Sequence, residues 1–76
     1  MAIEGLTVLL ARALVAVELA RREALRTEKD EAYELTFAEK ALTRGITKHK
    51  AHEGVDAQAF QMQVEVARRG FEGMPA

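Results

Sequence analysis

The first third of the chain carries apolar residues at the spacing of an amphipathic helix. One series repeats every seven residues, and a second, interleaved series keeps the same interval. The first series is Ile3, Leu10, Val17 and Ala24, and the second is Leu6, Ala13 and Ala20. This pattern predicts a helix with a heptad-like apolar seam, widened by Leu14 and Leu25. Val8, Leu9 and Val15 lie on the other side, so the helix needs cover on more than one face.

The predicted N-terminal helix is long, because neither glycine nor proline occurs between Leu6 and Arg44. Ordinary turns depend on those two residue types, and we therefore expect one helix from about residue 3 to about residue 44. A kink or break near 26–30 is the alternative. Basic Arg26 is followed by acidic Asp30 and Glu31, which is the charge order of one helix ending and another beginning.

A glycine-bounded connection is predicted after this helix. Gly45 is placed to end the helix as a left-handed C-cap, and residues 45–55 then form the connection. The stripe formed by Tyr33, Phe37 and Ala41 would belong to the last turns before that cap.

A second, shorter helix is expected over residues 56–69. Asp56 suits its N-cap, Gly70 suits its end, and Val55 can pack on Phe60 as a hydrophobic staple. The stretch 60–66 also alternates apolar and polar residues, as a half-buried strand would. Helix is favoured because the chain offers no second strand pattern with which this stretch could pair.

The predicted fold class is all-α, a helical hairpin that packs as a dimeric bundle. At a rise of about 1.5 Å per residue, the first helix would be about 60 Å long and the second about 20 Å. The second helix would leave much of the first uncovered, and we expect a second copy of the chain to cover it. The predicted dimer interface consists of Ile3, Leu6, Leu10, Ala13, Leu14, Val17 and Ala20.

The composition favours one small domain spanning residues 1–76. A single core of this size supplies only about 3–5 kcal/mol, and without cysteines no disulfide can add to it. The net charge of −1 creates no field that would draw the protein to nucleic acid or to an anionic membrane. The apolar run over 6–17 is shorter than the roughly 20 residues of a membrane span, so we expect a cytoplasmic protein.

The side chains offer little catalytic chemistry. Serine and cysteine are absent, which excludes the common nucleophiles, and the five glycines stand singly rather than in a phosphate-binding loop. His49, His52 and Glu53 form the one cluster with metal-ligating groups, but the i, i+3 spacing of the histidines differs from the usual i, i+4. We predict no metal, no cofactor and no enzymatic activity.

The function that remains is protein–protein interaction. We expect a small regulator, inhibitor, adaptor or assembly factor of bacterial or phage type, which acts as a homodimer and binds a larger protein. The candidate contact residues are Arg26, Tyr33, Phe37, Arg44, Lys48, Lys50 and Phe60. One alternative is a nucleic-acid-binding regulator that presents the basic segment 44–50 twice in a dimer. The other is a small structural subunit of a larger assembly.

Overall fold

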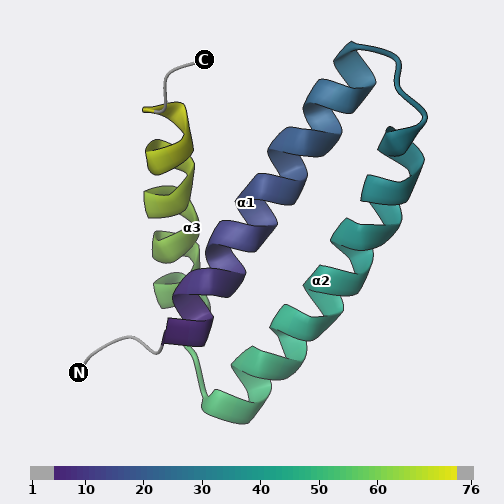
Figure 1. The fold of residues 1–76 in the computed structure, drawn as a ribbon. Coiled ribbons are helices and arrows are strands. Elements are labelled where there is room, and N and C mark those ends of the chain that lie inside the picture. The colour runs from purple at the N-terminus through teal and green to yellow at the C-terminus, as the bar shows by residue number, and fades with distance from the viewer. Residues whose placement is uncertain (1–4, 74–76) are drawn as a thin grey trace.

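The computed structural model describes residues 5–73, and these form three α-helices without a strand. The helices are α1 (Gly5–Arg26), α2 (Glu31–Glu53) and α3 (Ala57–Glu72). They run up, down and up, with α1 between the other two (Figure 1). Helix α1 packs against both neighbours, whereas α2 and α3 touch each other little. The all-helical fold class is confirmed, and the stretch 60–66 is helix rather than strand.

The predicted single helix from 3 to 44 is wrong, because the chain turns back at residues 27–30. The turn is a Schellman motif: the Lys29 amide donates to Ala24 O at 2.8 Å, and the Glu28 amide donates to Leu25 O at 3.2 Å. Glu28 takes the left-handed position with φ 56°, where glycine is usual. The absence of glycine therefore did not prevent a turn, and the alternative break near 26–30 is the one observed.

The predicted stop at Gly45 is also wrong, since α2 continues for two more turns to Glu53. The left-handed C-cap is Gly54, at φ 63°. A glycine inside a helix costs about 1 kcal/mol relative to alanine. Burial of the apolar Ile46 side chain beyond Gly45 offsets this cost. The connection expected over 45–55 shrinks to the few residues around Gly54.

Helix α3 begins as the sequence predicts and ends slightly later. The Asp56 carboxylate caps it by accepting from the Ala59 amide at 3.3 Å, and Val55 packs on the core just before it. The helix passes through Gly70 and ends at Glu72, with Gly73 as its C-cap.

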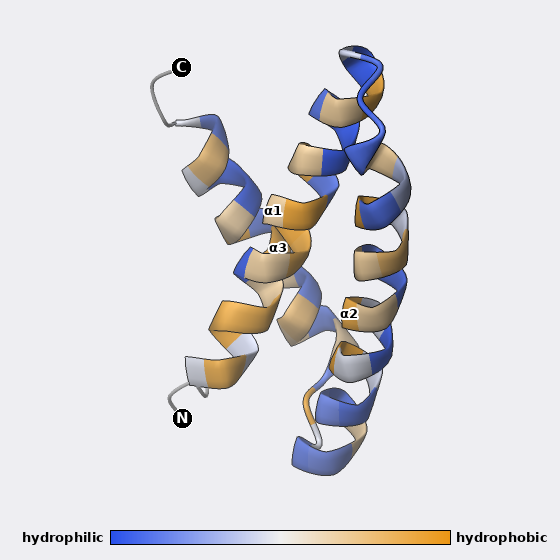
Figure 2. Cartoon of the chain, turned by 45° about the vertical axis from the view of Figure 1, so that its right-hand side comes forward, coloured by the Kyte–Doolittle hydropathy of each residue, from blue (hydrophilic) through white to orange (hydrophobic). Residues whose placement is uncertain are grey.

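The core lies where all three helices meet, toward the start of α1 and the end of α2. The buried cluster contains Ala11, Val15, Ile46, Phe60, Val64 and Ala67. A polar pair is buried as well: Thr7 Oγ1 and His49 Nε2 are hydrogen-bonded at 2.8 Å across the α1–α2 contact. Hydrophobic residues are accordingly concentrated on α1, and the turn between α1 and α2 is hydrophilic (Figure 2).

Candidate interaction surface

Large apolar side chains remain exposed at the end of the α1–α2 hairpin. Tyr33 and Phe37 lie one turn apart on α2 and are 72% and 65% exposed, and Leu25 at the end of α1 is 57% exposed. These three line an open hollow of about 630 Å³ between the two helices. Isolated exposed apolar residues are ordinary, but a contiguous group with two aromatic rings is typical of an interaction site.

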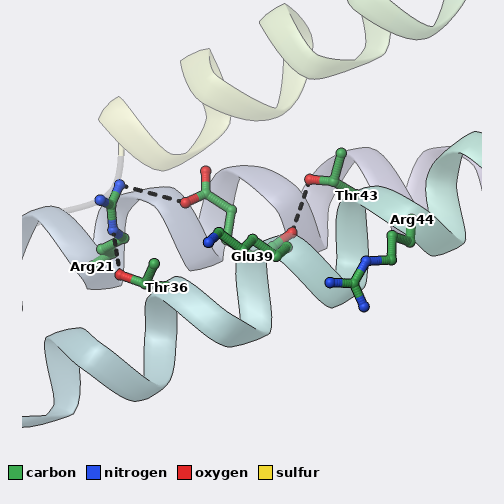
Figure 3. Close-up of a pocket in the computed structure, with 6 residues that line it drawn as sticks. Arg21, Thr36, Glu39, Thr43 and Arg44 are labelled. Atoms are coloured by element: carbon green, nitrogen blue, oxygen red, sulfur yellow. Dashed lines mark hydrogen bonds and ion pairs between the residues drawn. The ribbon is translucent and has the colours of Figure 1, made fainter.

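The hollow continues along the α1–α2 seam into a second one of about 490 Å³, because Arg21, Thr36 and Lys40 line both. In this second hollow Arg21 of α1 is bonded to two side chains of α2. Its Nε donates to Thr36 Oγ1 at 3.0 Å, and its Nη1 lies 3.5 Å from Glu39 Oε2 (Figure 3).

Helix α2 adds free positive charge at the far end of this groove. Arg44 and Lys40 both line it, and neither forms an ion pair within the described residues. In the close-up, the Arg44 guanidinium extends from α2 without a bond to the other residues drawn (Figure 3). The groove thus changes from aromatic at the hairpin turn to cationic two to three helical turns along α2.

Arg26, a predicted contact residue, is already engaged on its own helix. Its guanidinium Nε donates to Glu23 Oε2 at 2.9 Å, and both side chains are largely exposed. This hydrogen bond, followed by the charge attraction, lowers the pKa of the Glu23 carboxyl below its ordinary value and raises the pKa of Arg26. Arg26 borders the hairpin turn, but it does not line the hollow beneath Tyr33 and Phe37.

The basic residues of the predicted connection lie on helix α2 instead of in a loop. Arg44 and Lys48 are exposed, whereas the Lys50 ammonium lies 5.3 Å from the centroid of the Phe60 ring in a cation–π contact. Phe60 itself is 5% exposed and belongs to the core. Phe60 is a contact candidate only if its side chain is exposed, and this condition is not met, because the ring packs in the buried cluster with Ala11, Val15 and Ile46.

The seam predicted for dimerisation is partly used inside the protomer. Leu10 and Leu14 pack against the core cluster, Ala13 and Val17 are half-buried, and Leu6 and Ala20 are exposed. Ile3 lies outside the described residues.

The buried positions of α1 are Thr7, Ala11, Val15 and Ala24. Only Ala24 belongs to the predicted heptad series, and the other three lie off it. Thr7 is absent from the apolar repeats because threonine is a polar residue. Its hydroxyl can nevertheless be buried, because it is hydrogen-bonded to His49. The series Thr7, Ala11 and Val15 at i, i+4 spacing is the signal that could have found this face.

A second exposed apolar surface lies between α1 and α3, and no pattern in the sequence predicts it. Val66 and Phe71 line an open hollow of about 420 Å³ together with Arg12. Leu9 and Met62, one turn earlier on their helices, are exposed as well. Its hollow is smaller than the one beneath Tyr33 and Phe37, and no aromatic ring is exposed on it, which makes it a useful control for the α2 surface.

No metal-binding arrangement forms within residues 5–73, where no group of three or more His, Cys, Asp or Glu side chains comes together. His49 is turned into the core toward Thr7, and His52 is exposed. Of the helices described, none is long and apolar enough to cross a membrane.

The fold and the surface define the molecule as a three-helix domain, in its described part, with an exposed aromatic stripe on α2. The sequence matches no family model, and comparison with curated proteins and with solved structures finds no match.

Proposed function

We propose that this chain is a non-enzymatic protein-interaction module, and that it binds a larger protein through the outer side of α2 and the groove beside it. The observation that carries the proposal is the exposure of Tyr33 and Phe37 next to the hollow lined by Leu25. The chain has only four aromatic residues, so leaving two of them in water at one place forgoes much of the burial available to a small core.

The groove also suits recognition because it combines apolar and charged groups. Aromatic anchors with nearby arginine form the usual centre of an interface, and Arg44 lies on the same helix as Phe37. A regulator, inhibitor or assembly factor working in the cytoplasm fits such a surface, as does self-association of the module.

The test compares capture of partners by the tagged chain and two variants in extracts of the source organism. Phe37→Ser should abolish capture, because it removes an anchor whose truncation costs about 2 kcal/mol or more, roughly thirtyfold in affinity. Met62→Ser, at an equally exposed position on α3, is the matched control and should capture normally. Circular dichroism checks that both variants remain folded. Capture lost with Met62→Ser and retained with Phe37→Ser would place the interface on the other surface and refute the proposal.

A further inference from the structure

The outer side of α2 carries exposed residues at alternating intervals of four and three. They are Asp30, Glu34, Phe37, Ala41, Arg44 and Lys48, and each of them is exposed. Asp30, at the N-cap, already has helical dihedrals of −64° and −24°. Intervals of four and three are those of the a and d positions of a coiled coil, so all six residues lie along one seam. The inner side of α2 is used by the fold: Ala32 and Ile46 are buried, and Glu39 reaches Arg21 of α1.

The order of residue types along this seam is acidic, apolar, basic. Asp30 and Glu34 come first, Phe37 and Ala41 are in the middle, and Arg44 and Lys48 come last. None of the four charged residues forms an ion pair within the described part of the protomer. A sequence with this order is complementary to its own reverse.

We propose that α2 binds α2 of a second copy in antiparallel orientation, with a twofold axis that crosses the outer seam at the level of residue 39. This pairing brings Asp30 opposite Lys48, Glu34 opposite Arg44, and Phe37 opposite Ala41, and the twofold axis repeats each pair. A parallel pairing would place like charges together in every charged layer, which is destabilising. The inference rests on the proposed function, because it names the first partner of the same surface.

The fold leaves room for this contact. Helix α2 forms one edge of the molecule, and α3 lies on the far side of α1 (Figure 1). The seam from Asp30 to Lys48 is about 27 Å long, which is about five helical turns. Phe37 opposite Ala41 pairs a large side chain with a small one, as close packing of two helices requires.

The same geometry limits the strength of the pairing. Only the two symmetric layers of Phe37 and Ala41 are apolar, and exposed ion pairs contribute little each. Lys40 flanks the seam next to the axis, so the two copies of Lys40 face each other. The dimer is therefore exchangeable, and a larger protein that presents the same acidic, apolar, basic order would compete with the second copy for α2.

Sedimentation equilibrium over a range of protein concentrations, with charge-swapped variants, tests the pairing. Glu34→Arg and Arg44→Glu should each weaken dimerisation about 3- to 30-fold, because each puts like charges opposite in both symmetric layers. The double variant with both changes should recover the affinity of the original chain, since the pairs form again with signs exchanged. Lys40→Gln should strengthen dimerisation about twofold, and added salt should weaken it.

Matched controls come from α3, where Glu72 and Arg69 are exposed. Glu72→Arg and Arg69→Glu change the net charge equally and should leave the dissociation constant unchanged. The pairing is overturned if the α3 variants weaken dimerisation as much as the α2 variants do, or if the double variant fails to recover.

Orientation is measured with a spin label, because the chain has no cysteine of its own. Lys48→Cys labelled in both copies should give a distance of about 25–30 Å in the antiparallel dimer. A distance of about 10 Å, the spacing of neighbouring helix axes, would show a parallel pairing and overturn the inference. A chain that stays monomeric at all concentrations also overturns it. The proposed function would then still stand if Phe37→Ser abolished partner capture and Met62→Ser did not.

Discussion

Replacing Glu28 by glycine should stabilise the protein. Glu28 ends α1 at φ 56°, and the left-handed conformation costs an L-residue about 1–2 kcal/mol. Glycine avoids that cost but loses about 0.5–1 kcal/mol more conformational entropy on folding. Glu28 is exposed and its side chain forms no hydrogen bond or ion pair within the described residues, so no contact is lost. The net expectation is a gain of about 0.5–1 kcal/mol.

Gly54 provides the reverse experiment in the same molecule. It ends α2 at φ 63°, and an added Cβ would meet no atom within 4 Å. Gly54→Ala therefore introduces backbone strain without a steric clash, and it should cost about 1 kcal/mol. The two variants test one physical effect with opposite signs.

Thermal unfolding followed by circular dichroism at low protein concentration measures both effects, because dimerisation would add a concentration-dependent contribution. A change of about 1 kcal/mol moves the Tm of a domain of this size by about 4–8 °C. Glu28→Gln is the control, since it removes the charge but keeps the side chain, and its Tm should not change. If Glu28→Gly lowered the Tm, or if Glu28→Gln raised it as much, backbone strain would not be the dominant effect at this turn.

Three further predictions concern other parts of the fold. Thr7→Val removes the hydrogen bond between Thr7 and His49 at nearly unchanged side-chain volume, and it should lower the free energy of unfolding, measured with urea, by about 1–3 kcal/mol. An unchanged urea midpoint would contradict the assigned bond. Gly45→Ala should raise the same free energy by about 0.5–1 kcal/mol, because Gly45 is an exposed residue inside α2 with open space around it; a loss of stability would contradict this reading. Arg26→Gln should raise the pKa of Glu23 toward its ordinary value in an NMR titration; no change would show that Arg26 does not cause the shift. Because the pKa of Glu23 is lowered in the folded chain, its contribution to stability is present above the ordinary carboxyl pKa and is lost as the pH falls through the lowered one.

The helical class and the third helix could be predicted from the sequence because their signals are local. The alternating stretch 60–66 has no second strand pattern with which it could pair, which leaves helix. Asp56, together with Val55 and Phe60, marks the start of α3 within a few residues. The order of charges from Arg26 to Glu31 also indicated the break between α1 and α2. The absence of glycine favours an unbroken helix, but a Schellman turn with Glu28 in the left-handed position needs no glycine.

The end of α2 could not be predicted from local signals, because Gly45 and Gly54 are both acceptable caps. The choice depends on what lies beyond Gly45, and Ile46 and His49 are buried only because α1 and α3 come together there. The same packing decides that Phe60 is a core residue rather than an exposed anchor. Tyr33 and Phe37 are exposed because α3 lies on the other side of α1, and their role as contact residues stays a prediction.

The outer seam of α2 shows why a pattern search based on hydropathy alone misses some interfaces. Only Phe37 and Ala41 are apolar among its six positions, so the segment resembles an ordinary solvated surface. Its regularity is the spacing of four and three residues combined with the order acidic, apolar, basic. That order can be used for binding only if this face of α2 is exposed to solvent. The structure supplies this condition by turning Ala32 and Ile46 toward the core, which fixes the opposite side of the helix as the exposed one. A helix whose inner face holds the protomer together therefore presents, on its outer face, a sequence complementary to its own reverse.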